Sequence, residues 1–425
     1  MQPGWQVKRM AFMPYLDVSV LRALSAVCLV LVPCHGYSVL THEAIIDSVW
    51  DSNIRSLLLH RFPDATPEQL KEAHAYLYGG CLIQDMGYAP FSARMFSDLT
   101  HYVRSGDFVM TLLRDAQTLD EYAFALGALA HFASDHRGHP AVNHATAVIY
   151  PKLRARFGDV VTFEDNPASH LKTEFAFDVA QVSHGLYAPD AYHDFIGFKV
   201  SKPILERGFQ ETYGIAVKDI FGTLDLGIGT YRFSVGKLVP EMTKAAWQSK
   251  RSDIEKLSPG ITRSKFIYSL PRRKYEQEWD KEYRGPGPFA RFLALVFRLI
   301  PRFGPFKVMA FRPIPQSSEQ DFLRSFEATV GQYRQRLEDV RRGRLSLPNY
   351  NLDTGKPTEA GDYKLADEAY VHLLDKLAEH RFELVTPELR KEILAFFGRA
   401  DRSRLPAKTL QELEDLKPKA AGGPE

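Results

Sequence analysis

The sequence is poor in cysteine, with three cysteines in 425 residues. Two of them, Cys28 and Cys34, lie in an N-terminal segment that we expect to be a removable leader. The mature chain would then keep Cys81 alone, so no internal disulfide could form. A fold held together by disulfides is therefore excluded.

A strong excess of either charge is also absent. The 54 basic and 52 acidic residues leave a formal net charge of +2, which gives no global electrostatic reason to expect nucleic acid as a partner. Hydrophobic residues make up 45% of the chain and charged residues 25%, as in globular rather than disordered proteins. The length suffices for a large core, in one helical domain or two.

Long apolar runs are lacking as well. The run Ala23–Val32 near the N-terminus is about half of the roughly 20 residues that span a bilayer. It follows Lys8, Arg9 and Arg22, and the small and turn-forming residues after it end at Gly36. This is the pattern of a secretion signal, although an uncleaved anchor is the alternative. We expect a signal peptide over residues 1–36 and a secreted or periplasmic protein.

A lipid anchor at Cys34 is another way in which the leader could hold the protein at a membrane. The cysteine follows Leu31, Val32 and Pro33, and the proline stands where a lipid-attachment motif has a small residue. We therefore do not expect lipidation at Cys34.

Alternating patterns typical of β-strands are scarce, whereas helix signals are frequent. Residues 66–69 combine an N-cap threonine, a proline in the first turn and a capping-box glutamine. Another helix is predicted from Thr118 to about Ala133, with Gly138 and Pro140 ending it. The predicted class is mainly α.

Two pairs of side chains stand out in these helical segments. His131 precedes Asp135 by four residues, and His170 precedes Glu174 by four. Residues four apart share a helix face, so each pair can present an imidazole nitrogen and a carboxylate oxygen to one point. One such pair alone is usually a surface or core contact, but two of them indicate a polynuclear zinc site.

Further candidate donors cluster in the same half of the chain. A zinc centre needs neutral imidazoles, ionised carboxylates and an open position for water. The sequence offers these in the order His42, Asp85, His101, His131, Asp135, His136, His139, His144, His170 and Glu174.

At these residues the chain resembles the bacterial zinc-dependent phospholipase C family, which is related to the single-strand-specific zinc nucleases. The resemblance covers roughly residues 37–180 and rests on the order of the donors and on four local motifs. These are Ile83–Tyr88, Phe96–Tyr102, Ala125–Asp135 and His170–Glu174. It implies a multi-helix fold, which a helical C-terminal extension would follow.

The resemblance also implies the metal ligands, for two or three zinc ions. One ion would be held by the amino nitrogen and carbonyl oxygen of Tyr37, freed by cleavage after Gly36, with His42 and Asp135. A second would be held by Asp85, His101, His131 and Asp135. The family has tryptophan where Tyr37 stands, which matters little because the ligating atoms are in the main chain.

The third ion would use His170, Glu174 and one more histidine, and here the sequence departs from the family. The family has a histidine six residues after the shared aspartate, where this chain has Ala141. Either His139 or His144 must substitute, or the third site is empty. We favour His139, because Pro140 follows it.

Asp85 has two further interpretations. The resemblance places it where it could orient or deprotonate the attacking water as well as bind metal. It could instead cap a turn before Gly87, and Asp98 could be the ligand in its place.

The rest of the chain is predicted in segments. Residues 37–248 would form the catalytic domain, 249–318 an irregular basic and aromatic segment, 319–401 a C-terminal helical region and 402–425 a frayed tail. Residues 289–311 mix aromatics and arginines and contain no acidic side chain. They could lie in a lipid interface or pack on the catalytic domain with arginines reaching outward.

The expected function is that of a secreted zinc phosphodiesterase that hydrolyses phospholipids by means of a metal-activated water. The first alternative is an extracellular zinc nuclease or nucleotidase, and the second is a zinc-stabilised binding protein without activity.

Overall fold

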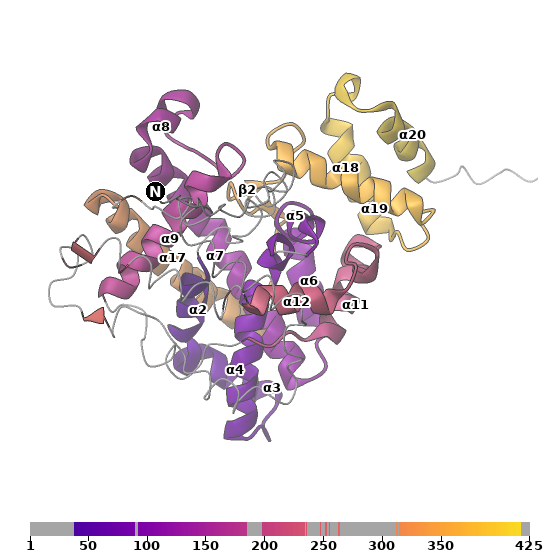
Figure 1. Cartoon of the computed structure of the whole chain (residues 1–425). Helices are drawn as coiled ribbons and strands as arrows, with labels where there is room; N and C mark the ends of the chain where they lie inside the picture. The colour runs from indigo at the N-terminus through magenta and orange to yellow at the C-terminus, as the bar shows by residue number, and fades with distance from the viewer. Residues whose placement is uncertain are drawn as a thin grey trace, which may run out of the picture.

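The computed structural model describes residues 38–89, 92–184, 198–233 and 314–417, with positions 235, 247, 251, 252, 255, 262, 263 and 312. Figure 1 shows that helices dominate this part of the chain. They number fourteen α-helices, with one short antiparallel pair of strands. The mainly α fold that the sequence predicted is confirmed. The predicted signal peptide, Tyr37 and the 289–311 segment lie outside the described residues.

The N-terminal helices follow one another with short connections. They are α2 (Val39–Asp47), η1 (Trp50–Ile54), α3 (Arg55–Arg61), α4 (Pro67–Leu82), η2 (Ile83–Tyr88), α5 (Arg94–Tyr102), α6 (Ser105–Asp115), α7 (Leu119–Ile149), α8 (Pro151–Phe157) and α9 (Pro167–His184). The later elements are α11 (Lys202–Tyr213), η3 (Val217–Asp219), α12 (Leu224–Phe233), α17 (Gln316–Arg341), β1 (Tyr350–Asn351), β2 (Lys356–Pro357), α18 (Lys364–Glu379), α19 (Pro387–Arg399), η6 (Arg402–Arg404) and α20 (Ala407–Leu416).

Helix α7 is the axis of the fold, and α4 and α17 pack along it (Figure 1). The helices α4 and α7 approach closely because glycines meet at their contact. A Cβ atom on Gly127 would lie 2.1 Å from the Leu77 carbonyl oxygen and 2.9 Å from Gly80 Cα. A side chain on either glycine would force the backbones apart.

Helix α7 does not end at Gly138 and Pro140, so that prediction is wrong. Pro140 has no N–H to donate to the His136 carbonyl oxygen one turn earlier, yet the helix continues to Ile149. Gly355 approaches this carbonyl so closely that a Cβ atom there would lie 2.7 Å from the oxygen, and its φ of +68° also suits glycine. The close packing of the 350–357 hairpin supports the helix where its own ladder is interrupted.

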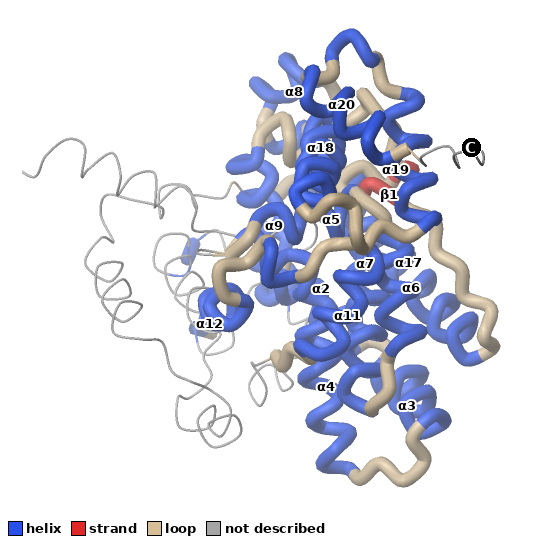
Figure 2. Tube along the Cα trace, turned by 90° about the vertical axis from the view of Figure 1, so that its right-hand side faces the viewer, coloured by secondary structure: helices blue, strands red, loops and turns tan. Residues whose placement is uncertain are grey.

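The C-terminal helices α18, α19 and α20 lie together beyond one end of α5 (Figure 2). The frayed tail predicted for residues 402–425 is wrong for residues 402–417, which include η6 and α20. Leu413 and Leu416 are buried, and α20 packs against α18. The segment is mostly charged, and its narrow apolar stripe, which α18 covers, was therefore not recognised from the sequence. Within the described ranges, no helix has the length and apolarity of a transmembrane span.

Candidate metal centre

One face of α7 carries three of the candidate donors. His131, Asp135 and His139 are spaced four residues apart and are all fully buried. Since a helix turns by about 100° per residue, the three side chains lie on one stripe. His144, by the same count, is rotated about 180° from Asp135 and is exposed on the other side.

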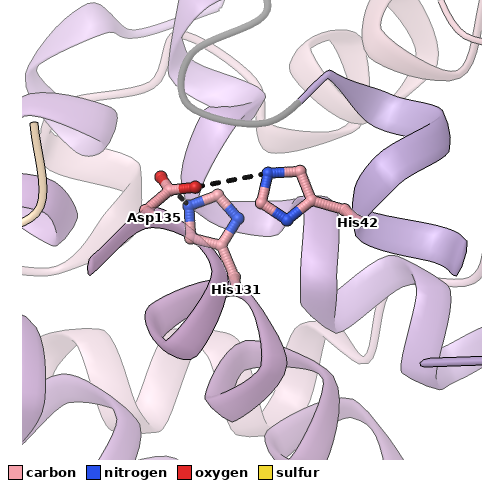
Figure 3. A group of neighbouring side chains, drawn as sticks. All are labelled: His42, His131 and Asp135. Atoms are coloured by element: carbon pink, nitrogen blue, oxygen red, sulfur yellow. Dashed lines mark ion pairs between the residues drawn. The ribbon is translucent and has the colours of Figure 1, made fainter. Parts of the chain in front are cut away.

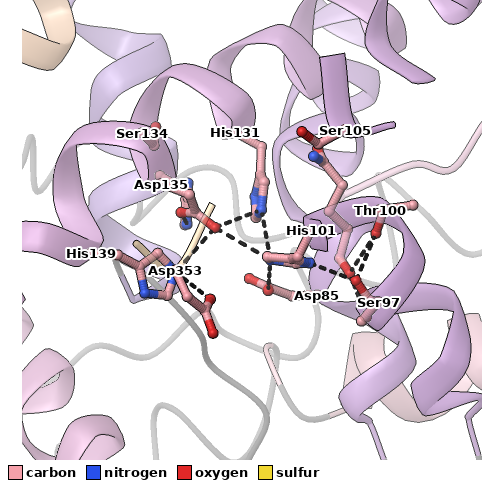
Figure 4. A network of polar contacts seen from close by, with 12 residues as sticks. Asp85, Ser97, Thr100, His101, Ser105, His131, Ser134, Asp135, His139 and Asp353 are labelled. Atoms are coloured by element: carbon pink, nitrogen blue, oxygen red, sulfur yellow. Dashed lines mark hydrogen bonds and ion pairs between the residues drawn. The ribbon is translucent and has the colours of Figure 1, made fainter. Parts of the chain in front are cut away.

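The carboxylate of Asp135 lies in the middle of the centre, where four imidazoles surround it. Its Oδ1 lies 3.4 Å from His42 Nε2, which reaches across from α2 (Figure 3). Its Oδ2 lies 3.3 Å from Nε2 of His101, 3.0 Å from that of His131 and 3.4 Å from that of His139 (Figure 4). Segments far apart in sequence thus share one carboxylate.

A second group of donors shares His131 with the first and adds Asp85 and His101. His101 comes from the last turn of α5 and Asp85 from η2, and His101 Nε2 lies 3.4 Å from Asp85 Oδ1. The Nε2 atoms of His101 and His131 are 3.3 Å apart. Asp98 instead forms an ion pair with Arg94 at 3.3 Å. The structure thus places Asp85, and not Asp98, beside the two histidines.

The third group joins α7 to α9. His170 Nε2 lies 2.7 Å from Glu174 Oε1 within α9, and the His139 ring stacks on the His170 ring. Because α7 continues through Pro140, His139 faces this pair, whereas the exposed His144 has its Nδ1 near the Asp159 carbonyl oxygen at 3.0 Å.

Two histidines are oriented by main-chain carbonyls. His131 Nδ1 donates to the Cys81 carbonyl oxygen at 2.8 Å, and His101 Nδ1 donates to that of Ser97 at 2.8 Å. With Nδ1 as the donor, the neutral form of each ring carries its lone pair on Nε2, which is aimed into the centre. The close contact of α4 with α7 is what brings the Cys81 carbonyl within reach of His131.

Burial and the neighbouring charged groups shift the pKa values of the donor side chains. Burial, followed by the nearby His131, lowers the pKa of His42 to about 3. Burial and the neighbouring His139 likewise hold the pKa of His170 well below its usual value. Burial alone would raise the pKa of Asp135, but His131 and His139 outweigh it and hold that pKa well below its usual value. At neutral pH His42 and His170 are therefore neutral and Asp135 is ionised, the forms that bind metal. Despite their burial, His101 and His139 have raised pKa values because of the carboxylates beside them, so these two histidines would release a proton when metal binds.

The residues fit zinc by their type and by their spacing. In the described part of the chain, three buried groups bring donor atoms within 4.8 Å of one another, namely His42, His131 and Asp135; Asp85, His101 and His131; and His139, His170 and Glu174. Imidazole nitrogen and carboxylate oxygen are usual zinc ligands, and bonds of about 2.0–2.1 Å place tetrahedral ligands about 3.3 Å apart. The contacts of Asp135 match this separation. Both ring nitrogens of His139 are buried, and neither forms a hydrogen bond within the described structure.

Sequence reasoning missed Asp353, which also lies in the centre. Its side chain is fully buried, and its Oδ1 is 3.5 Å from His139 Nε2 (Figure 4). The local signal, Asn351-x-Asp353-x-Gly355, is typical of a surface turn, so sequence reasoning could not connect it with the histidines. His136, in contrast, lies outside the three groups and stacks on Tyr350.

The fold and the site together define a helical protein with a buried polynuclear metal centre. Residues 41–222 match the family model described as zinc dependent phospholipase C. The matched part of the chain contains all the donors of the three groups, and the family that it matches is one of phosphodiesterases. Comparison with curated proteins gave no match, and neither did comparison with solved structures.

Proposed function

We propose that this protein is an exported zinc phosphodiesterase that cleaves phospholipids between glycerol and phosphate. The observation that carries the proposal is the position of Asp135, whose carboxylate meets four imidazoles inside a domain of the phospholipase C family. A carboxylate so surrounded is suited to bridging two cations. The proposal assigns the first ion to His42 and Asp135, with the main-chain atoms of Tyr37, and the second to Asp85, His101, His131 and Asp135.

Each residue has a definite task in this proposal. Bound zinc would lower the pKa of a water molecule toward about 7 and provide positive charge for the phosphate oxygens. Asp85 Oδ1 lies 3.4 Å from His101 Nε2 and receives no hydrogen bond among the described residues. Asp85 would bind metal and also accept a proton from the attacking water. The leaving group would be the diacylglycerol alkoxide.

Zinc removal and restoration on the mature protein test this function. We expect at least two zinc ions per chain, no activity after chelation, and recovered cleavage of a phosphocholine diester when zinc is restored. A His144→Ala variant is the control, because this histidine is exposed and outside the three groups. It should behave as the wild type in every step.

The other outcomes separate the alternatives. Cleavage of single-stranded DNA without cleavage of the phosphocholine diester would make the protein a nuclease. Zinc binding without cleavage of either substrate would make it a zinc-stabilised binding protein. Fewer than two zinc ions per chain would overturn the arrangement altogether.

Export and membrane contact belong to the same proposal. The leader at residues 1–36 supports export, and N-terminal sequencing of the purified protein should begin at Tyr37. A chain that retains residues 1–36 would contradict this step. The arginines and aromatics of 289–311 support contact with lipid, so a synthetic peptide of these residues should bind anionic vesicles. If the peptide does not bind, the alternative remains that residues 289–311 pack on the catalytic domain.

A further inference from the structure

The carboxylate of Asp353 reaches the centre from far along the chain. Residues 41–222 match the family, and Asp353 lies outside this match, in the turn between β1 and β2. The side chain is nevertheless fully buried, and it faces His139 across 3.5 Å (Figure 4).

The turn that carries Asp353 is fixed from two sides. The Leu352 amide donates to the His101 carbonyl oxygen at 3.0 Å, at the end of α5. On the α7 side, the Asn143 side chain donates to the Asp353 carbonyl oxygen at 2.9 Å, and Gly355 packs against His136 and Pro140. Both helices that hold the turn also carry donors of the centre, so the position of Asp353 is set by the same elements as the histidines.

The two oxygens of the Asp353 carboxylate differ. Oδ2 accepts two phenol hydroxyls, from Tyr102 at 2.8 Å and from Tyr363 at 2.6 Å. Oδ1 is buried and receives no hydrogen bond among the described residues. A buried carboxylate oxygen without a donor is costly unless a positive charge compensates it. Two tyrosines therefore orient the carboxylate so that its uncompensated oxygen faces His139.

The distance of 3.5 Å supports a shared cation rather than a direct hydrogen bond. Hydrogen bonds between N–H and oxygen have donor–acceptor distances of 2.7–3.2 Å, and the contact between His139 Nε2 and Asp353 Oδ1 is longer. It is close to the roughly 3.3 Å that separates two ligands of one tetrahedral zinc. The charge count agrees, because a histidine that binds metal is neutral, so His139 and His170 with Glu174 would leave a bound dication one negative charge short of neutrality. Asp353 would supply that charge.

We propose that Asp353 is a metal ligand of this centre, and that its Oδ1 and His139 Nε2 hold the same cation. The C-terminal region would then complete the metal site of the family domain. This inference rests on the proposed metal binding of the three groups. It predicts that zinc affinity depends on a residue that the family match does not contain.

The test is an Asp353→Asn variant of the full mature chain, which keeps the shape of the side chain and removes its charge. Asp98→Asn is the matched control, since Asp98 lies near the centre but pairs with Arg94. Zinc content is measured by mass spectrometry after equilibration with a chelator of known affinity. We expect Asp353→Asn to bind its weakest zinc at least tenfold less tightly, and Asp98→Asn to bind zinc as the wild type does.

A second measurement separates a ligand from a structural role. In cobalt-substituted protein, loss of a ligand changes the visible absorption of the metal, whereas a loosened hairpin with all ligands retained does not. Thr358→Ala removes the hydrogen bond from the residue after β2 to the Tyr102 carbonyl oxygen but keeps Asp353 and both of its hydroxyl donors. It should therefore keep its cobalt spectrum and shows what a loosened hairpin alone does. If Asp353→Asn does not fold, Asp353→Glu replaces it, and the longer side chain should alter the spectrum.

The outcomes are distinct. Wild-type zinc content and an unchanged cobalt spectrum in Asp353→Asn, or in its Asp353→Glu replacement, would overturn the inference and leave the proposed function intact. A wild-type protein without zinc would instead end the proposed function itself.

Discussion

Gly127 of α7 lies against Gly80 of α4, and a Cβ atom added to Gly127 would be 2.9 Å from Gly80 Cα. This contact joins the packing of the fold to the chemistry of the centre. Because the two backbones touch, the Cys81 carbonyl reaches His131 Nδ1 at 2.8 Å. The hydrogen bond then orients a histidine that belongs to two of the three donor groups.

Gly127→Ala should therefore destabilise the protein and weaken the metal centre together. Alanine normally favours a helix over glycine by roughly 0.5–1 kcal/mol, but its Cβ would lie 2.1 Å from the Leu77 carbonyl oxygen. We expect a net loss of about 1–3 kcal/mol in the free energy of unfolding, measured by chemical denaturation, with a reduced zinc content. Gly331→Ala in α17 is the control, since nothing lies within 4 Å of its added Cβ. A Gly127→Ala variant as stable as the wild type would show that the helices can separate without cost.

Asp135→Asn should have a larger effect on zinc than any single histidine substitution. Four imidazoles lie 3.0–3.4 Å from this carboxylate, and an amide cannot supply the same negative charge. Residues that only orient ligands change metal affinity by about 10–100-fold, so we expect a loss greater than about 100-fold for the shared ligand. Zinc titration with a competing chelator measures this. Retention of all bound zinc by Asp135→Asn would rule out a bridging role.

Substitution of the two candidate histidines of the third group should have different effects on the zinc content. His139 is fully buried between Asp135 and His170, whereas His144 is exposed. We predict that His139→Ala loses one zinc per chain and that His144→Ala loses none. Metal analysis of the two purified variants decides between them. The reverse result would mean that helix α7 ends near Pro140 after all.

The stability of the N-terminal helix should depend on pH through Asp178. This carboxylate accepts hydrogen bonds from Thr41 Oγ1 at 2.7 Å and from the Leu40 amide at 3.4 Å, at the start of α2. Burial raises its pKa from 3.8 to about 6, despite these donors. The folded state therefore binds the proton more tightly than the unfolded state, and the resulting stability is lost as the pH rises through about 6.

Asp178→Asn removes this titration. Between pH 5 and pH 8 the pKa shift corresponds to about 1.4 kcal/mol of stability that the wild type loses. The difference in unfolding free energy between wild type and variant should therefore change by about that amount over this range, in favour of the variant at pH 8. Denaturation curves at both pH values measure it, and the same zinc-free state must be used for both proteins. A difference that does not vary with pH would show that Asp178 does not titrate in this range.

Much of the helical structure could be predicted, because its signals are local. The capping box at residues 66–69 is present as expected, with the Gln69 amide donating to Thr66 Oγ1 and the Thr66 amide to Gln69 Oε1. The i, i+4 pairs also lie on single helix faces. The end of α7 was predicted wrongly, because the packing of Gly355 against the His136 carbonyl compensates for Pro140.

The sequence by itself determined the helical class and the two histidine–carboxylate pairs, because helix geometry relates residues only four positions apart. The tertiary structure alone decided which histidine faces His170, that residues 402–417 are folded, and that Asp353 reaches the centre. These depend on contacts between segments distant in sequence, and no local pattern encodes the distance between a turn at residue 353 and a histidine on α7.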